Sequence, residues 1–411
     1  MRRCLPSAVG GYVVGVTGST TLTLSVLLAI ACPVTCLLVW NRLGRRAWLR
    51  VSVRAFLLVI SQATAVLLVA LLVNNQYVFY ASWAELFGQS SLISSAASVS
   101  QHRVDRQYAH QLRRAYLHGH GTVIPWTVPG YASGLPPLHA LVYLPAAYGN
   151  PALRGVQFPV VELLDGVPGR PESWVGPLKL QGTLDALIAN GQSVPFIAVM
   201  PTQNVVFPRD TQCVNVVGGP QVDTYLTRDV HRSVLAGLRA TPDAVGWALM
   251  GYSTGGYCAV NLAMRHPDLF AAAVSLSGYA HPASDPSVGS LFGGSAALLR
   301  HNTPVWEAAH WGRRNLSILA VASAPDGVPY RDTLKLAAAA RPPLRISTIL
   351  LAAGAHNPRL WKAMEPVAFN WLSHQLVPPL AGIVIDGRFC HPVPGLPGVR
   401  HHAHCSTTTK S

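Results

Sequence analysis

The sequence predicts an α/β fold, a mostly parallel sheet with helices on both faces, preceded by two transmembrane helices. Two observations support this prediction. From about Thr122, short apolar runs alternate with longer segments of helical spacing, a pattern typical of parallel sheets covered on both faces. Before that point, two apolar runs without charged residues extend over about residues 20–40 and 55–73. The length of each run is close to the roughly 20 residues that a helix needs to span a bilayer core.

The predicted organisation has four parts. They are a membrane anchor (1–85), a Ser/Ala-rich and then His/Arg-rich connector (86–115), the α/β domain (116–376) and an irregular tail rich in Pro, Gly and His (377–411). Strands are expected at residues 138–145, 158–166, 194–201, 246–251, 271–278, 317–323 and 345–352. Helices are expected at residues 173–191, 225–240, 255–267, 330–340 and 359–376.

The charge distribution bears on both partners and topology. Charged residues make up 12% of the chain, about half the usual density. The formal net charge is +14, but no Lys/Arg run with interleaved aromatics occurs in the α/β domain, so nucleic-acid binding is not expected.

The loop between the apolar runs contains five arginines, Arg42, Arg45, Arg46, Arg50 and Arg54. The positive-inside bias makes this loop cytoplasmic and predicts an extracytoplasmic α/β domain attached to the bilayer of the cell membrane.

Two other interpretations of the N-terminus are less favoured. A cleaved signal peptide does not explain why the first apolar run begins late and a second one follows it. A lipoprotein signal ending at Cys32 has small residues before the cysteine but lacks a leucine three positions earlier.

The cysteines are expected to form disulfides, because an outer compartment permits them. The four cysteines after the second apolar run allow three connectivities, of which we favour Cys213 with Cys258 and Cys390 with Cys405. The tail also contains His391, His401, His402 and His404. Their spacing matches no standard zinc pattern, so no metal site is predicted, and no cofactor is implied elsewhere.

The segment WALMGYSTGGYCAV, residues 247–260, predicts a nucleophilic serine. Ser253 follows an apolar strand and precedes a helix, and Gly251 and Gly255 flank it at two residues on each side. A serine on such a sharp strand-to-helix turn is crowded, which is why glycine is needed at both positions. The alternative is a serine in an ordinary β-to-α turn.

A nucleophilic serine in this arrangement requires an acid and then a histidine at the ends of later strands. Asp326 follows the strand at 317–323, and His356 follows the last strand after a flexible glycine. We expect His356 to act as the general base and Asp326 to orient it. Competing residues are Asp285, Glu307, Asp332, His281 and His310.

The oxyanion formed on attack needs backbone N–H donors. One is expected from Thr254, the residue after the nucleophile. The other is expected from Val167 in the loop after the strand VVELLDG, because Gly166 would let the backbone approach the substrate and Pro168 has no N–H.

The combination of LLDG with Trp174, the elbow GYSTGGY, and GAHNPRLW with Trp361 resembles the esterase D and mycolyltransferase branch of the α/β-hydrolases over roughly residues 122–376. The resemblance implies an α/β-hydrolase fold with an eight-stranded type of core, a Ser/acid/His triad and acyl transfer. Two features depart from it: the acid is Asp326 where mycolyltransferases use Glu, and Asn357 and Pro358 directly follow the histidine.

The insertion at residues 281–311 lies where such folds place a cap over the site. Its Leu291, Phe292, Trp306 and Trp311 could line an acyl pocket or pack on the core. The candidate substrate-binding residues are therefore Trp174, Trp306, Trp311 and Trp361.

The hypothesis from the sequence is a membrane-anchored serine esterase or acyltransferase of the cell envelope. Its substrate would be an acyl ester, with water or a hydroxyl acceptor such as a sugar taking the acyl group. The alternative is a non-catalytic binding or cell-wall interaction module with the same fold, because fold does not determine function.

Overall fold

The computed structural model describes residues 19–40, 47–77, 104, 106–206, 209–284, 288–312, 314–381, 384–385 and 388–389. It divides into two compact units, Met1–Ser91 and Leu92–Ser411. Each unit is described by itself.

The described part of the first unit consists of two apolar helices, α1 (Ser19–Val39) and α2 (Ala47–Tyr77), which pack against each other. Both are long and apolar enough to cross a membrane. Many of their large apolar side chains are exposed, among them Leu37 and Val66 at 77% and 68%. The second helix begins before the predicted residue 55, because the segment carrying Arg50 and Arg54 continues it. Arg54 donates to the carbonyl of Trp40 at 2.7 Å and stacks on its indole.

The second unit is built on an eight-stranded sheet of order β1-β2-β5-β4-β6-β7-β8-β9. Its strands are β1 (Thr122–Val128), β2 (Leu138–Leu144), β4 (Val160–Leu164), β5 (Ile197–Pro201), β6 (Trp247–Tyr252), β7 (Ala272–Leu276), β8 (Leu316–Ser323) and β9 (Leu344–Leu351). The pairs β1–β2 and β2–β5 are antiparallel, and all other pairs are parallel. The predicted fold class, a mostly parallel sheet of the α/β-hydrolase type, is therefore confirmed.

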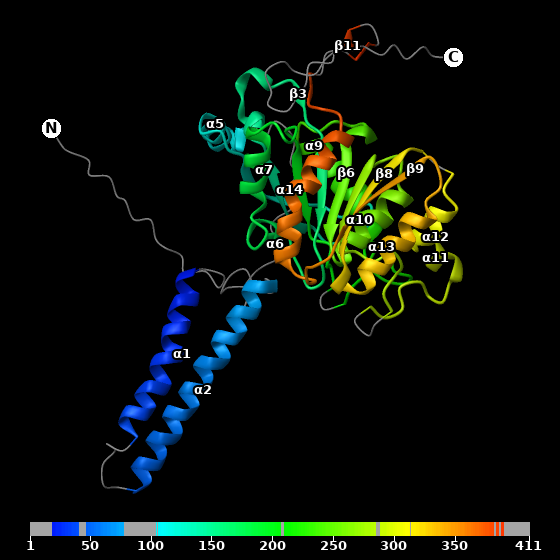
Figure 1. The fold of residues 1–411 in the computed structure, drawn as a ribbon. Coiled ribbons are helices and arrows are strands. Elements are labelled where there is room, and N and C mark those ends of the chain that lie inside the picture. The colour runs from blue at the N-terminus through cyan, green and yellow to red at the C-terminus, as the bar shows by residue number, and fades with distance from the viewer. Residues whose placement is uncertain are drawn as a thin grey trace, which may run out of the picture. The chain divides into compact units, whose positions relative to one another are not determined.

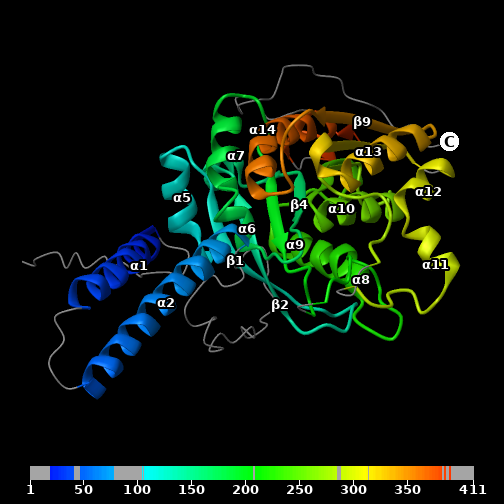
Figure 2. The same cartoon turned by 60° about the horizontal axis from the view of Figure 1, so that its bottom comes forward.

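Helices cover both faces of this sheet, as Figures 1 and 2 show. The long elements are α5 (Ala109–Leu117), α7 (Leu180–Ala189), α10 (Thr254–Arg265), α13 (Val328–Ala339) and α14 (Pro358–Gln375). The short ones are η1 (Ala146–Gly149), η2 (Pro151–Leu153), α6 (Glu172–Val175), α8 (Val222–Thr224), η3 (Tyr225–Val230), α9 (His231–Gly237), η4 (Ala244–Gly246), α11 (Ala296–His301), α12 (Pro304–Ala309) and η5 (Ala324–Asp326). One core contains side chains of α10, η3 and α9, and the other contains those of α7 and α14. Strand β6, which ends directly before the candidate nucleophile Ser253, thus lies between two buried layers.

The structure differs from the sequence prediction at several places, among them α5, which begins in the segment 86–115 expected to be a connector. Strand β1 is not among the predicted strands, because Pro125 interrupts its apolar pattern. A proline is tolerated there because β1 is an edge strand of the sheet. The predicted helix at 173–191 is divided into α6 and α7 around Lys179, whose φ is 59°. The tail expected to be irregular begins with short strands: β10 (Leu380–Ala381) pairs with β3 (Val156–Gln157), and β11 (Val384–Ile385) pairs with β12 (Arg388–Phe389).

Candidate active site

Ser253 occupies the turn between β6 and α10. Its backbone has φ 56° and ψ −126°, a strained conformation for a residue with a side chain. A Cβ at Gly251 would overlap the backbone of Gly255, and one at Gly255 would overlap the carbonyl of Leu164. Both glycines are therefore required by close backbone contacts, and the turn presents the Ser253 hydroxyl beyond the carboxyl end of the sheet.

His356 and Asp326 meet at this serine. The Nε2 atom of His356 lies 2.8 Å from the Ser253 Oγ, and its Nδ1 lies 2.9 and 3.0 Å from the two carboxylate oxygens of Asp326. Asp326 ends the short η5 after β8, and His356 follows β9. The Asp326 side chain is 6% exposed and the imidazole 40%. The three residues thus have the geometry of a nucleophile, its base and the group that orients the base.

The competing residues bond to other partners. His281 Nδ1 lies 2.6 Å from the carboxylate of Asp332, which also accepts from the backbone N–H of Ala280. Glu307 bonds to His301 at 2.8 Å, and His310 Nδ1 lies 2.8 Å from the carbonyl of Trp306. Asp285 lies outside the described residues. The described competitors therefore have structural partners of their own.

The loop after β4 also approaches Ser253. A Cβ on Gly166 would lie 3.0 Å from the Cβ of Ser253, so the backbone at Gly166, directly before Val167, runs beside Ser253. Asn204 holds this loop by donating to the carbonyls of Gly166 and Gly169 at 3.1 and 2.9 Å. Gln203 donates to the carbonyl of Asp165. The Val167 N–H and the Thr254 N–H at the start of α10 are thus the candidate oxyanion donors.

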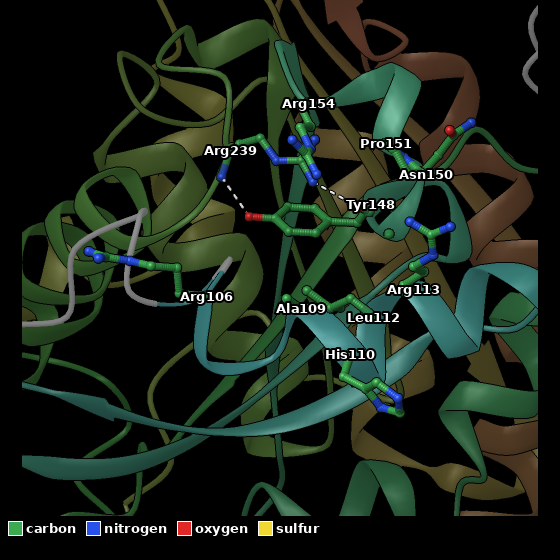
Figure 3. A pocket seen from close by; sticks show the side chains of 11 residues that line it. Arg106, Ala109, His110, Leu112, Arg113, Tyr148, Asn150, Pro151, Arg154 and Arg239 are labelled. Atoms are coloured by element: carbon green, nitrogen blue, oxygen red, sulfur yellow. Dashed lines mark hydrogen bonds between the residues drawn. The ribbon is translucent and has the colours of Figure 1, made fainter.

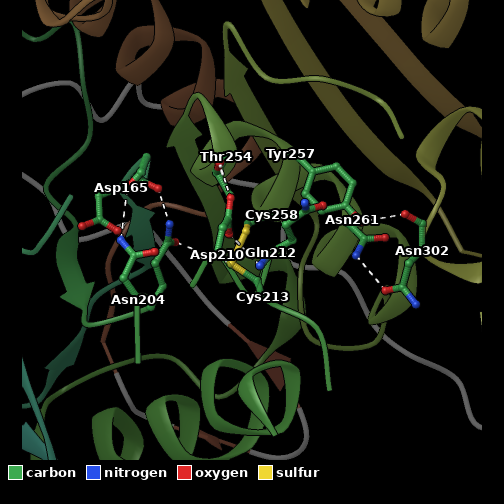
Figure 4. Close-up of a disulfide and its surroundings, with 12 residues drawn as sticks. Asp165, Asn204, Asp210, Gln212, Cys213, Thr254, Tyr257, Cys258, Asn261 and Asn302 are labelled. Atoms are coloured by element: carbon green, nitrogen blue, oxygen red, sulfur yellow. Dashed lines mark hydrogen bonds between the residues drawn. A yellow bond between two sulfur atoms is a disulfide. The ribbon is translucent and has the colours of Figure 1, made fainter. Parts of the chain in front are cut away.

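A disulfide lies behind the elbow (Figure 4). It joins Cys213 to Cys258 of α10, the pairing favoured from the sequence. In the same loop as Cys213, Asp210 accepts from the Thr254 hydroxyl at 3.0 Å and from the backbone N–H of Gln212 at 2.8 Å. Asp210 and Cys213 are therefore attached to α10, and Gln203 and Asn204 to the candidate oxyanion loop.

A row of aromatic side chains, each in contact with the next, lies beside the site. The ring of Tyr252 is stacked on Trp361, with centroids 4.4 Å apart, and Trp174 meets Tyr252 edge-on at 5.2 Å. Trp361 in turn contacts His356. Burial raises the pKa of the Tyr252 phenol, and burial likewise raises the pKa of the nearby Asp165 carboxyl well above its usual range. Burial thus favours the uncharged forms of both groups.

The four tryptophans suggested as substrate-binding residues have different surroundings. Trp174 is fully buried under the elbow, and Trp311 is packed in the core with α10 and α12 side chains. Their place in the structure is that of core residues, which corrects the expectation that they face a substrate. Trp306 stacks on His310. Trp361, also largely buried, is the one that contacts a candidate catalytic residue.

Other expectations concern residues with little or no structural description. Cys390, Cys405 and the tail histidines lie outside the described residues.

The apolar residues Leu291 and Phe292 of the insertion, considered above for an acyl pocket, pack with Val214 and Val216 in a small separate cluster. Among the described residues no group of three His, Cys, Asp or Glu side chains could hold a metal ion.

Sequence reasoning missed Asn204, Gln203 and Asp210. All three follow β5, the strand next to β4 in the sheet, so their position at a carboxyl end was a usable signal. Their hydrogen bonds depend on how the loop folds back, which the residue pattern does not specify.

The fold and the strand-to-helix turn at Ser253 are those of the α/β-hydrolases, a class that includes hydrolases and acyltransferases. The comparisons with known proteins agree. The model of the Esterase family matches residues 136–375, more than half of the chain. The chain belongs to the Esterase family.

Two curated relatives are similar over parts of their sequences. An uncharacterized protein of Corynebacterium glutamicum is 26% identical over 262 residues, which cover 60% of this chain and 59% of the relative. The MPT51 antigen of Mycobacterium leprae is 39% identical over 77 residues, 19% of this chain and 25% of the antigen. The chain thus matches less than two thirds of the length of either relative.

Solved structures show the same fold. A ferulic acid esterase superposes with a TM-score of 0.53 at 18% identity and covers 62% of this chain and 99% of its own. An S-formylglutathione hydrolase from Agrobacterium tumefaciens has a TM-score of 0.53 at 14% identity and covers 63% and 97%. At these identities the likeness establishes the fold alone.

Proposed function

We propose that this protein is a membrane-anchored serine esterase or acyltransferase that acts on an acyl ester in the cell envelope. The observation that carries the proposal is the continuous set of contacts from Ser253 through His356 to Asp326, with distances of 2.8 and 2.9 Å. A serine hydroxyl becomes nucleophilic only when a base accepts its proton, and this set supplies both the base and the group that orients it.

The reaction follows from these contacts. The Ser253 Oγ attacks the ester carbonyl carbon while His356 Nε2 accepts the hydroxyl proton. The carbonyl oxygen becomes an oxyanion, which the N–H groups of Val167 and Thr254 stabilise. Collapse of this intermediate breaks the bond to the leaving alcohol, which takes the proton from His356. Asp326 fixes the imidazole tautomer and stabilises its cation throughout.

The resulting acyl-enzyme is resolved by a second attack. The oxygen of water, or of an acceptor hydroxyl such as that of a sugar, attacks the acyl carbon while His356 accepts its proton. The bond between the acyl carbon and Ser253 Oγ then breaks, and His356 returns the proton to that oxygen. The exposed imidazole leaves the site accessible to such an acceptor. Membership of the Esterase family supports an ester as the substrate.

Membrane attachment is proposed for α1 and α2. Their length and hydropathy, and the exposure of their apolar side chains, support two spans. Arg42, Arg45 and Arg46 between them, together with Arg50 and Arg54 near the start of α2, favour a cytoplasmic loop and an extracytoplasmic catalytic domain. A maleimide reagent that does not cross membranes tests this topology on intact cells. A single cysteine introduced at Ser295 is expected to react and one introduced at Gly44 to be protected; the reverse pattern would refute the topology.

The catalytic proposal is tested by labelling the full chain in detergent with a fluorophosphonate probe. We expect Ser253 to be labelled, S253A to remain unlabelled, and hydrolysis of p-nitrophenyl esters to fall by at least about 10³-fold in S253A. Comparing acyl chains of increasing length, with and without sugar acceptors, separates hydrolysis from transfer. A folded wild-type protein that neither reacts with the probe nor cleaves any ester would favour the non-catalytic binding module instead.

A further inference from the structure

A cavity lies in the α/β domain, where α5 meets the loop after β2 (Figure 3). Its volume is about 890 Å³. Because β2 is antiparallel to β5, the η1 turn that follows β2 lies at the amino-terminal edge of the parallel strands. Ser253, Asp326 and His356 all follow carboxyl ends. The cavity is therefore separate from the candidate active site.

The described lining of this cavity is strongly basic. It contains Arg106, His110, Arg113, Arg154 and Arg239, and none of its described residues is acidic. Like charges gathered around one space repel each other, and a bound anion would relieve that repulsion. The lining thus favours an anionic ligand.

Arg239 is a fixed positive charge in the wall of the cavity. It is 5% exposed, its Nη atoms donate to the carbonyls of Tyr148 and Leu153, and its guanidinium lies 3.8 Å from the centroid of the Tyr148 ring. The Tyr148 hydroxyl accepts from the Arg239 backbone N–H at 3.1 Å. Among the described residues Arg239 has no carboxylate partner. A buried cation without a counterion is unfavourable, so an anion near this guanidinium would stabilise it.

Arg113 on α5 and Arg154 after η2 lie at the mouth of the cavity. Both are exposed, and neither has a hydrogen bond or ion pair with the described residues. Arg154 directly follows Leu153, whose carbonyl accepts from Arg239, and Figure 3 shows Arg113 on the side of Asn150 and Pro151. Guanidinium groups bind phosphate oxygens through paired N–H donors. The geometry therefore combines one fixed and two adjustable phosphate-binding groups.

We propose that this cavity binds a phosphate group, as a monoester or diester, and that its source is the headgroup of an anionic phospholipid. The lipid source rests on the membrane attachment proposed above. The phosphate site itself depends neither on that attachment nor on esterase activity. A soluble phosphate ester is the other source of the same chemistry.

The test measures binding to the full chain in a nonionic detergent by isothermal titration calorimetry. The probes are dihexanoyl phosphatidylglycerol, its zwitterionic phosphatidylcholine counterpart, and glycerol 3-phosphate. The variant R113E/R154E reverses both charges at the mouth, and R300E/R341E is the matched control, because Arg300 and Arg341 are exposed and lie outside the described lining. Thermal unfolding of each variant confirms that it is folded.

We expect dihexanoyl phosphatidylglycerol to bind the wild type and R300E/R341E alike, within about twofold, and to bind R113E/R154E at least about tenfold more weakly. Phosphatidylcholine should bind far more weakly than phosphatidylglycerol. Comparable binding of glycerol 3-phosphate, equally sensitive to R113E/R154E, supports the phosphate site and overturns the lipid source. Failure of both anionic probes to bind, or equal binding to R113E/R154E, overturns the site. Ester hydrolysis by R113E/R154E is expected to be unchanged, so failure here is distinguishable from failure of the catalytic proposal.

Discussion

The indole of Trp361 meets the imidazole of His356 edge to face, with ring centroids 5.2 Å apart and planes at 88°. Trp361 is itself held by stacking on Tyr252, the residue before the nucleophile. The candidate base is thus positioned from two directions, by Asp326 at its Nδ1 and by Trp361 at the ring. This relationship makes Trp361 a positioning residue in the proposed mechanism.

Replacing Trp361 with Ala is expected to lower kcat more than it changes KM. Loss of the aromatic contact, worth about 0.5–1.5 kcal/mol, corresponds to up to about a tenfold reduction. The truncation should also cost about 3–5 kcal/mol of stability, whereas W361F should restore most of both. The pH dependence of kcat/KM separates the two effects, because loss of the His356 contact should displace the limb that reports the base.

The matched control is W306A. Trp306 also stacks on a histidine, His310, with centroids 4.2 Å apart, but neither residue contacts Ser253 or Asp326 in the described structure. W306A should leave the pH profile unchanged. A pH profile of W361A identical to that of the wild type would show that Trp361 contributes to stability alone.

Replacing Asn204 with Ala is expected to lower kcat by about tenfold. The substitution removes two hydrogen bonds to the loop that carries Val167, each worth about 0.5–1.5 kcal/mol. The loop would hold the candidate oxyanion donor less firmly, and this donor acts in the transition state, so KM should change little. Steady-state kinetics and the rate of fluorophosphonate labelling measure the effect.

N370A provides the comparison for N204A. Asn370 donates to the carbonyl of Gln192 at 2.6 Å on a different part of the domain. Its removal should affect stability modestly and leave kcat intact. If N370A and N204A reduced kcat equally, the special role given to the loop after β4 would be refuted.

Removal of the disulfide is expected to affect stability and catalysis together. Cys213 and Cys258 are separated by 45 residues, and a loop of that length predicts a loss of about 4 kcal/mol in the chain-entropy model. The bond also joins the segment with Gln203 and Asn204 to α10. C213A/C258A should therefore unfold at lower denaturant concentration and lose activity before global unfolding; parallel loss of both would argue against a separate effect on the site.

Much of this site could be predicted from sequence because its groups follow strand ends in a fixed order. Ser253, Asp326 and His356 come together because parallel strands end at one edge of the sheet. Trp174 and Trp311 were judged from their motifs and position, but their burial depends on how α6 and α12 pack, which apolar patterning does not reveal. Asn204 was missed because its partners are backbone carbonyls in another loop, and no side-chain pattern records them.

Replacing Glu162 with Gln is expected to raise stability at neutral pH. Glu162 lies on the central strand β4, fully buried, with no hydrogen-bond partner for its carboxyl among the described residues. Burial raises the pKa of this carboxyl well above its usual range. A carboxyl with a raised folded-state pKa keeps its proton while the unfolded chain releases it. Stability is therefore lost as pH rises from about 4.3 toward the folded-state pKa, by about 1.4 kcal/mol per pH unit.

The free energy of unfolding of E162Q should therefore fall less steeply with rising pH than that of the wild type, by the contribution of one proton. Denaturant unfolding of the full chain in detergent between pH 5 and 8 measures this slope.

The control is E172Q, because the pKa of Glu172 is shifted in the opposite direction. Burial alone would raise the pKa of Glu172, but its hydrogen bond with His139 and the charges of His139 and Arg170 lower it overall. Its contribution is present above the unfolded-state pKa of about 4.3 and is lost as pH falls through the folded value. E172Q should thus act on the acid side, and an E162Q curve parallel to the wild type would show that Glu162 is not protonated in the core.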